Sequence, residues 1–548
     1  MFEDKDSLKE MLGLGGFVGL AQINLVAGDL EYNYNKICDV VKKSDDLGLD
    51  AISFPKNTLI GFDMSDYIAR FPFLIENQFK YLQKIADNQF KTPIVISFLN
   101  NEKDFSIAII RNGAIGQIVE NKDFITSKLL NDGVEYYIKP TSISSRMGSQ
   151  YEREQELIEN SKTLKRPILE INQVGAIDCW SYSGQSLACD ENGNIFARAK
   201  AFEEQLLIVN PFRKIGNVYS DKPKKMPMEF SLDYDWDLER VYKSTVQAIR
   251  DYFNKCGLKR AVLGLSGGLD STVSAVLVAD AIGKENVYGV SMPSKLTSIE
   301  SKSDAKELAE NLGIGFCEIS IKPMVETSNS CFGELFDNVE KIWTCRYKQS
   351  FTQDNIQARS RAMYLWGIAN EFESCIPIAT SDKSEAYMGY ATINGDMSGG
   401  FAPIADITKT KLFALARWIN KNRFPNNSIP ESVILKRPGA ELAIDPNTGK
   451  TLCAEDALMP YEFLDEVIWR IENKHENYTE LLNSSFLYEI KENFSKEQKK
   501  IWLDKFFRRM ATSVYKWSIL PPSVIIDSES INKTDYQIPI TSARVNFQ

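Results

Sequence analysis

The residues best suited to chemistry lie in one short stretch, LGLSGGLDS, at positions 263–271. The apolar residues just before it predict a short buried strand, and TVSAVLVADAIG just after it predicts an amphipathic helix. The Ser-Gly-Gly side chains between them are small enough for backbone N–H groups to close on an anion, and a helix N-terminus adds a favourable dipole. At the helix start, the Asp270 carboxylate can hold Mg²⁺ and the Ser271 hydroxyl can reach phosphate. The stretch therefore predicts a phosphate-binding loop.

This loop differs from the Walker pattern, because no Lys-Ser/Thr pair follows its glycines. The alternative is an ordinary strand–turn–helix corner whose glycines only permit tight packing. The SGGLDS residues match the pattern expected of a phosphate-binding loop and lie between a strand and a helix, which favours the phosphate interpretation. SGGxDS resembles the pyrophosphate loop of the ATP pyrophosphatases, which cleave ATP between the α- and β-phosphates and transfer AMP to a carbonyl or carboxylate. That resemblance assigns ATP binding to Gly264, Leu265, Ser266, Gly267, Gly268, Leu269, Asp270 and Ser271.

Length and composition narrow the class of protein. The 548 residues exceed one ordinary core and predict two domains. A net charge of −10 argues against a general nucleic-acid binder, and the absence of a long apolar run predicts no membrane span. Nine scattered cysteines without a CxxC pair predict neither disulfides nor a zinc site, so we expect a reducing cytoplasm. The only histidine, His475, lies in a polar run, so chemistry must use carboxylates, lysines, hydroxyls and backbone.

The order of predicted elements indicates two α/β domains. Strands mixed with a few helices over residues 1–212, with an Asn112–Gly113 hairpin turn, predict a layered α/β domain. Residues 213–235 carry prolines, a glycine and a basic cluster without periodicity, and are predicted to be a linker. A long amphipathic helix opens the domain predicted over residues 236–548. Its later alternation of strand and helix predicts a doubly wound parallel sheet with the site at the strand C-termini.

The first half resembles the nitrilase-like glutaminase domain of glutamine-dependent NAD synthetases, on AQINLVAGDLEYNYNKI, the FPKNTLIGF corner and INQVGAIDCWSYSGQSLACDENGNIFARAKAFEEQLLIV. The resemblance implies a nitrilase-like α/β sandwich in which a Glu, a Lys and a Cys hydrolyse glutamine. Here Lys56 stands in the place of the Glu. No Cys-Glu-Asp stretch separates the expected lysine region, Asn121–Lys122, from PTSISSRMGSQYEREQ, and neither Cys38 nor Cys179 has the nucleophile's position. We therefore expect a packing and assembly module that does not hydrolyse glutamine.

The second half resembles NAD synthetases in an ordered series of segments: NVYGVSMPSKLTSIESKSDAKELAENLGI, DNIQARSRAMYLW, IATSDKSEAYMGYATINGDMSGGFAPIADITKTKLFALARWIN, RPGAEL and VYKWSILPPSV. The resemblance implies an ATP pyrophosphatase domain. It also implies the following roles: ATP contacts by Ser294, Arg359 and Thr380; contacts to the dinucleotide substrate by Asn355, Glu385 and Lys516; Mg²⁺ ligation by Asp270 and Glu385; charge compensation on phosphate by Lys409; and orientation or deprotonation of ammonia by Asp396. Asn355 and Arg359 are also expected to share one helix face, four residues apart.

The implied reaction is amidation of the deamido-NAD carboxylate by ammonia, driven by ATP through an acyl-adenylate. The resemblance further implies a homo-oligomer, with ammonia taken up free or from a separate glutaminase. Three departures from the family pattern lie where substrate choice can change: Ser381–Asp382 for Gly-Asn, Gly439 for Ser, and Trp517 for Arg. They leave open a paralogous adenylating amide ligase that acts on another carboxylate. A non-catalytic partner that only binds nucleotide is a third possibility, which the intact SGGLDS loop and Glu385 disfavour.

Overall fold

A computed structural model describes residues 15–62, 70–100, 102, 104–120, 125–126, 135–233, 238–343, 351–423, 428–439, 453–488 and 495–531. The chain divides into two compact units, Met1–Met226 and Pro227–Gln548. The division falls inside the stretch 213–235. Part of that stretch is hydrogen-bonded within the first unit, because the Arg198 N–H donates to the Asn217 carbonyl and the Tyr219 N–H to that of Arg198. The first unit thus extends beyond residue 212.

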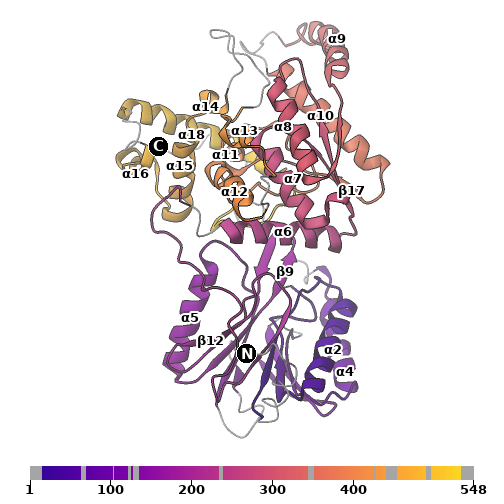
Figure 1. Cartoon of the computed structure of the whole chain (residues 1–548), viewed down its shortest axis with the longest axis vertical. Helices are drawn as coiled ribbons and strands as arrows, with labels where there is room; N and C mark the ends of the chain where they lie inside the picture. The colour runs from indigo at the N-terminus through magenta and orange to yellow at the C-terminus, as the bar shows by residue number, and fades with distance from the viewer. Residues whose placement is uncertain are drawn as a thin grey trace. The chain divides into compact units, whose positions relative to one another are not determined.

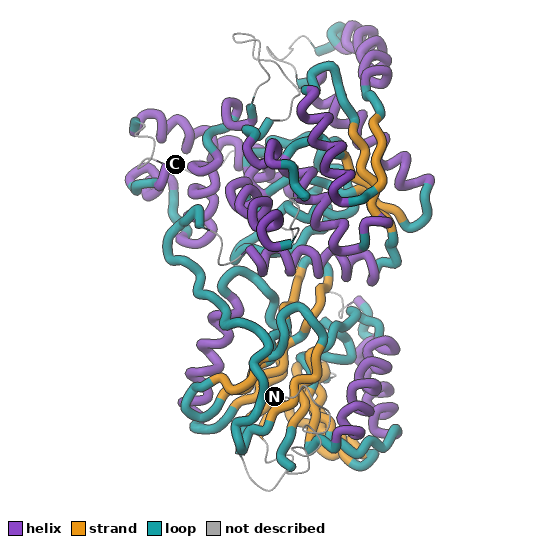
Figure 2. Tube along the Cα trace, in the orientation of Figure 1, coloured by secondary structure: helices purple, strands orange, loops and turns teal. Residues whose placement is uncertain are grey.

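Two sheets form the centre of the first unit (Figure 2). One has the order β13(Gln205–Val209)-β1(Val18–Gln22)-β2(Ala51–Ser53)-β3(Ile94–Leu99)-β4(Phe105–Arg111)-β5(Ala114–Glu120). The other has the order β12(Ile195–Arg198)-β11(Leu187–Cys189)-β8(Ile168–Asn172)-β7(Tyr137–Thr141)-β6(Ile125–Thr126). The predicted Asn112–Gly113 turn joins β4 to β5, and both turn residues have the positive φ of a hairpin turn. A short hairpin, β9(Val174–Ile177) and β10(Trp180–Ser183), completes the described strands.

Helices cover both outer faces of this pair of sheets (Figure 1). The sheets pack face to face through buried apolar side chains such as Leu20 and Ile138. On one side α2(Leu30–Leu47) and α4(Phe73–Asp87) cover the first sheet, and on the other α5(Ser149–Leu164) covers the second through Leu157. In α2 the buried Ile37 and Val41, four residues apart, lie on one face. The predicted α/β sandwich is confirmed.

A parallel sheet organises the second unit. Its order is β16(Gly315–Glu318)-β15(Val287–Ser291)-β14(Arg260–Gly264)-β17(Cys375–Pro377), and every pairing is parallel. The consecutive residues Ala261, Val262 and Leu263 of β14 are all buried, as in strands covered on both faces. The helix α7(Leu269–Ile282) contacts β14 and β15, while α10(Thr352–Glu371) packs against Val262 through Leu365. The predicted doubly wound sheet is confirmed.

The second unit contains further helices in addition to α7 and α10. They are α6(Leu238–Lys255), η2(Lys284–Asn286), α8(Ile299–Leu312), α9(Lys322–Val339), α11(Lys383–Tyr387), α12(Lys409–Asn422), α13(Glu431–Leu435), α14(Ala454–Ala457), α15(Tyr461–Lys474), α16(Tyr478–Asn483) and α18(Lys496–Trp517). An apolar cluster joins α11, α15 and α18 through Tyr387, Phe463 and Phe506. In the described part of the chain, no helix is both long and apolar enough to cross a membrane.

Candidate active site

The predicted phosphate loop connects β14 to α7 and turns through a conformation that requires glycine. Gly267 has φ +74°, and a Cβ at this position would lie 2.1 Å from the backbone oxygen of Ser301. Ser266 Oγ accepts a hydrogen bond from the Gly268 N–H (3.2 Å) and lies 3.1 Å from Ser271 Oγ. The N-cap of α7, Gly268, provides no side-chain cap, so the first amides of the helix are open to an anion.

The loop forms one wall of a cavity of about 610 Å³. Segments far apart in the sequence supply the other walls: α10, the loop before α11, α11 itself, the loop before α12, and α18. Among the predicted site residues, those on the cavity wall are Gly264, Leu265, Ser266, Gly267, Gly268, Leu269, Asp270, Ser271, Asn355, Thr380, Glu385, Asp396, Lys409 and Lys516. The fold thus brings together residues spread over some 250 positions of the chain.

Two predicted ATP contacts, Ser294 and Arg359, lie outside the cavity lining. Ser294 Oγ accepts from the Leu296 N–H at 3.1 Å, and Arg359 Nε donates to the Ile393 carbonyl at 3.2 Å. Arg361, two residues along α10, lines the cavity instead. The sequence showed both arginines, but only the packing of α10 decides which of them faces the cavity, because neighbours two apart lie on different helix faces.

Asn355 and Arg359 share a face of α10, as their spacing predicts. Asn355 Oδ1 accepts from Thr392 Oγ1 at 2.8 Å, and Arg359 contacts the next residue of the same loop. Across the cavity, Lys516 Nζ donates to the carbonyls of Gly389 (2.7 Å) and Ala391 (2.6 Å). Burial lowers the pKa of this ammonium. One loop, residues 389–392, therefore contacts two of the three predicted substrate-binding side chains, Asn355 and Lys516.

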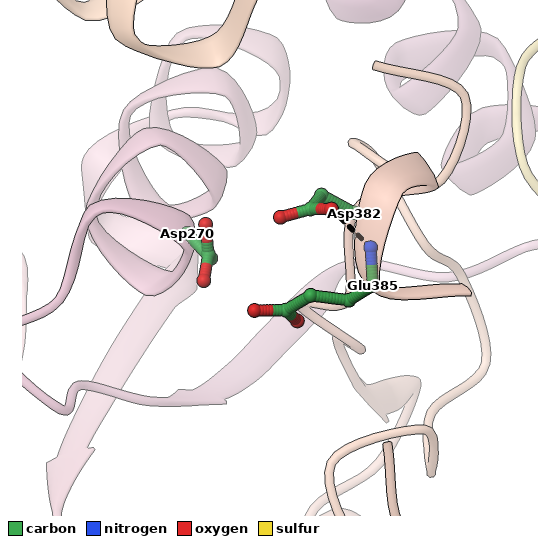
Figure 3. A group of neighbouring side chains, drawn as sticks. All are labelled: Asp270, Asp382 and Glu385. Carbon is green, nitrogen blue, oxygen red and sulfur yellow. Dashed lines mark hydrogen bonds between the residues drawn. The ribbon is translucent and has the colours of Figure 1, made fainter. Parts of the chain in front are cut away.

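A cluster of three carboxylates around one ammonium lies where the phosphate loop meets α11. We call it the cavity cluster; its members are Asp270, Asp382, Glu385 and Lys409. Lys409 Nζ lies 2.7 Å from Asp270 Oδ1, 2.5 Å from Asp382 Oδ2 and 3.1 Å from Glu385 Oε1. Figure 3 shows the three carboxylates pointing toward one another, Asp270 from α7 and the other two from the start of α11. Asp382 and Lys409 are fully buried, whereas Asp270 and Glu385 reach the cavity.

Burial and mutual repulsion shift the ionisation of this cluster. Burial raises the pKa of Asp270 and of Glu385, with Asp382 adding to the shift and Lys409 opposing it. Burial by itself would lower the pKa of Lys409, but the three carboxylates outweigh it and raise that pKa well above its ordinary value. Three carboxylates around one ammonium are therefore difficult to keep fully ionised beside this cavity unless another cation joins them.

The donor chemistry of the cavity cluster fits Mg²⁺. One oxygen from each of the three carboxylates lies within 4.8 Å of the others. Carboxylate oxygens are the ligands that Mg²⁺ prefers, and three negative charges against one positive leave a formal −2 for a divalent cation to neutralise. Asp270 and Glu385 were predicted as ligands. Asp382 was noted only as an added charge, although its place three residues before Glu385 at a helix start was visible in the sequence.

Buried polar contacts fix the short helix α11 behind the cluster. Asp382 Oδ1 caps the helix by accepting from the Glu385 N–H at 2.9 Å. Ser384 Oγ donates to Asp465 Oδ1 at 2.5 Å and accepts from the Lys409 N–H at 2.9 Å. The fully buried Lys383 points away from the cluster and pairs with three further carboxylates, Glu472 (2.8 Å), Asp527 (3.1 Å) and Asp406 (3.2 Å). Neighbouring residues of α11 are thus anchored in opposite directions.

In the first unit, the predicted degenerate position Lys56 is half-buried at the end of β2. Its N–H donates to the Thr141 carbonyl at 3.2 Å, and its ammonium lies 5.1 Å from the Phe105 ring centroid. The expected lysine region, Asn121–Lys122, is outside the described residues. The cysteines of this unit, Cys38, Cys179 and Cys189, are all buried.

Two of these cysteines carry thiols that resist ionisation. Burial raises the pKa of Cys38, and it raises the pKa of Cys189 to about 11. Cys189 lies 3.3 Å from Ser161 Oγ, between α5 and β11. A thiol with a raised pKa is protonated at neutral pH, and the thiolate is the nucleophilic form.

Comparisons with known proteins agree with this architecture. A family model described as NAD synthase matches residues 241–504. The glutamine-dependent NAD(+) synthetase of Aquifex aeolicus is 31% identical over 597 residues, covering 95% of this chain and 98% of that protein. The protein of the same description from Synechocystis is 35% identical over 362 residues, covering 66% of this chain and 60% of that protein.

A solved structure shows the fold of the whole chain. The crystal structure of a glutamine-dependent NAD(+) synthetase from Cytophaga hutchinsonii has a TM-score of 0.76 at 19% identity, covering 96% of this chain and 97% of that one. The sequence relationship to the Aquifex aeolicus protein extends over nearly the full length of both chains. This chain therefore belongs to the NAD synthetase family, whose members are ligases that form carbon–nitrogen bonds.

Proposed function

We propose that this chain converts deamido-NAD, ATP and ammonia into NAD, AMP and pyrophosphate, and that its first unit does not hydrolyse glutamine. The family relationship supports the ATP-dependent amidation. One observation supports this reaction for this chain. The phosphate loop, members of the cavity cluster and the predicted substrate contacts Asn355 and Lys516 line the same cavity.

The first step activates a carboxylate, because its charge repels a nucleophile and it has no good leaving group. A carboxylate oxygen of deamido-NAD attacks the α-phosphorus of ATP, the bond to the bridging oxygen breaks, and pyrophosphate leaves. The amides at the start of α7 and the turn at Gly267 hold the pyrophosphate. Lys409 offsets the phosphate charge, and Thr380 contacts ATP. Mg²⁺, when held by Asp270 and Glu385, supplies further charge neutralisation on the phosphate oxygens.

The second step is displacement of AMP by ammonia. The nitrogen lone pair attacks the acyl carbon, the acyl–oxygen bond to AMP breaks, and the nitrogen loses a proton to leave the neutral amide. Asp396 lines the cavity and accepts a hydrogen bond from the Thr392 N–H at 2.7 Å. We assign to it the orientation of ammonia or the acceptance of its proton. Asn355, Glu385 and Lys516 are assigned to the dinucleotide.

Three observations support a first unit without glutaminase activity. A cation, Lys56, replaces the acid expected at the end of β2. The unit contains no Cys-Glu-Asp segment. Two of its three cysteines, Cys38 and Cys189, have raised thiol pKa values. We propose that the unit serves packing and assembly in a homo-oligomer, with ammonia taken up free or from a separate glutaminase.

The test measures pyrophosphate release and NAD formation by the purified chain with ATP and deamido-NAD, with ammonium or glutamine as the nitrogen donor. We expect both products with ammonium and neither amide nor glutamate with glutamine. Turnover with glutamine equal to that with ammonium would refute the silent first unit. Pyrophosphate release with neither donor would favour the alternative of a different carboxylate substrate, and a screen of nucleotide carboxylates would then identify it.

A further inference from the structure

Asp382 is a buried carboxylate whose two oxygens have different partners. Its Oδ1 caps α11 by accepting from the Glu385 N–H. Its Oδ2 points into the cavity cluster, where it is ion-paired with the Lys409 ammonium at 2.5 Å and accepts no hydrogen bond from any other described group. The side chain has no exposed surface, so water cannot satisfy this oxygen. A fully buried anionic oxygen is unfavourable unless a cation compensates it, and here a single ammonium is shared by three carboxylates.

The surrounding geometry suits a small divalent cation. The ligand oxygens of Asp270, Asp382 and Glu385 already lie within 4.8 Å of one another, in a region reached from the cavity. Octahedral Mg²⁺ places ligands at about 2.0–2.1 Å, so its oxygens are about 3–4 Å apart. To reach those separations the three carboxylates would turn from their present contacts with Lys409 toward the ion. Within the described part of the chain, Lys409 is the single cation within ion-pair distance of all three carboxylates.

An Asn at position 382 would carry one negative charge fewer than Asp382. With Asn, the two carboxylates and one lysine sum to −1, and a bound divalent cation leaves +1. In this chain the sum is −2, and a divalent cation leaves zero. The extra charge also opposes the polyphosphate of ATP when no divalent cation is present.

We propose that Asp382 is a third carboxylate ligand of the cation site, and that it lets a divalent cation bind this chain before ATP does. The proposal rests on the proposed function only in placing ATP in the same cavity. It predicts two opposite effects of removing the Asp382 charge: weaker binding of the cation alone, and stronger binding of ATP in the absence of the cation. If Asp382 only capped α11, its replacement by Asn would produce neither of these two effects.

Asp382→Asn is a clean variant for this test. An Asn side chain has nearly the same size and keeps a carbonyl oxygen that can accept from the Glu385 N–H, because Asn is as good an N-cap as Asp. The matched control is Asp354→Asn, which removes a carboxylate from the wall of the same cavity on α10, outside the three-carboxylate group. Asp270→Asn removes a ligand predicted from the sequence and serves as the positive control.

The experiment measures Mn²⁺ binding to the full-length, nucleotide-free protein by electron paramagnetic resonance and calorimetry. We expect the Mn²⁺ dissociation constant to rise about tenfold or more in Asp382→Asn and Asp270→Asn, and to stay within about twofold in Asp354→Asn. ATP binding is then measured in the presence of EDTA, where Asp382→Asn should bind at least as tightly as the wild type. Circular dichroism melting confirms that each variant is folded.

An unchanged Mn²⁺ dissociation constant in folded Asp382→Asn would overturn the proposal. Weaker binding of ATP by this variant in EDTA would also overturn it, because loss of a repulsive charge cannot weaken binding of an anion. These readouts use neither deamido-NAD nor ammonia. A chain that binds Mn²⁺ through Asp382 but forms no NAD would refute the proposed function alone, and a chain that forms NAD with an unchanged Mn²⁺ affinity would refute this inference alone.

Discussion

Each unit of this protein contains a buried group of charged side chains, and the two groups are built differently. In the first unit, Lys139, Arg153 and Arg198 face Glu154, Glu156 and Glu170, with ion pairs of 2.7 Å for Arg198–Glu154, 3.5 Å for Arg153–Glu170 and 3.6 Å for Lys139–Glu170. We call these six residues the sandwich cluster. Its three cations balance its three anions, of which Glu154 and Glu170 are buried and Glu156 lies exposed at the edge of the cluster. The cavity cluster sets three carboxylates against one lysine, and its members Asp270, Glu385 and Lys409 line a cavity.

This difference separates a structural use of buried charge from a functional one. Charges that are mutually balanced and closed off have their desolvation offset within the fold and need no ligand. A group with a net charge beside a cavity is not fully compensated by the fold, and a ligand of opposite charge can neutralise it. The following four predictions test that distinction, from the largest expected effect to the smallest.

Removing the central anion of the sandwich cluster should destabilise the first unit. Glu170 is fully buried between Arg153 and Lys139, so Glu170→Gln removes the ion-pair partner of the buried Arg153 and leaves Lys139 paired with Glu156 alone. We expect a loss of about 3–5 kcal/mol in stability, measured by hydrogen exchange of first-unit peptides. The control is Glu156→Gln, whose side chain is 58% exposed and pairs with Lys139 at 2.7 Å; its loss should stay below about 1 kcal/mol. If first-unit peptides of Glu170→Gln exchanged their amide hydrogens as slowly as those of the wild type, a structural role of Glu170 would be contradicted.

Removing an anion from the cavity cluster should instead remove activity and leave stability nearly unchanged. In Asp270→Asn, Lys409 keeps Asp382 and Glu385 as partners, and repulsion among the carboxylates falls. We expect pyrophosphate release to fall about 10²–10³-fold, with the melting temperature unchanged within a few degrees. Retention of pyrophosphate release by the folded variant would show that the loop does not bind the reacting phosphates.

Asp465 differs from the carboxylates of both clusters, because its hydrogen-bond donors are neutral. It lies behind the cavity cluster. It accepts from Ser384 Oγ (2.5 Å) and the Thr410 N–H (2.7 Å), and burial raises its pKa to about 6. The folded chain therefore binds this proton more tightly than the unfolded chain, and stability falls as pH rises from about 4 to about 6. This group should contribute a decrease of about 2–3 kcal/mol.

The measurement compares unfolding free energies in urea across this pH range. Asp465→Asn cannot ionise, so its stability should decline less between those pH values than that of the wild type. Glu310→Gln, a change at an exposed side chain of α8, should leave the slope of the wild type unaltered. Parallel curves for Asp465→Asn and wild type would show that Asp465 has an ordinary pKa.

Restoring an acid at the first unit's degenerate position should have almost no effect. Lys56→Glu supplies the missing carboxylate, but Cys38 and Cys189 keep raised thiol pKa values and the Cys-Glu-Asp segment is still missing. Glutamine-dependent turnover should stay at background, with ammonium-dependent turnover within about twofold of the wild type. Glutamate release by the variant would show that Lys56 by itself silences the domain.

Much of the fold could be predicted from local patterns. The strand before the phosphate loop, the helix after it and the Asn112–Gly113 turn are each specified by residues within a few positions, so periodicity and turn chemistry sufficed. The extent of the first unit was harder to predict. Residues 213–220 lack a periodic pattern, yet they hydrogen-bond to the β12 end, a long-range pairing that local composition does not encode.

The sequence by itself determined the residue types of the site: a glycine at 267 whose backbone no other residue adopts easily, carboxylates at 270 and 385, and a lysine at 409. Only the tertiary structure decided which of these charges meet. It placed Asp382 beside Asp270 and Lys409, selected Arg361 over Arg359 for the cavity wall, and turned Lys383 away toward Glu472. The reason is physical: residue type sets a side chain's charge and shape, whereas packing between distant helices sets its neighbours and therefore its ionisation and its ligands.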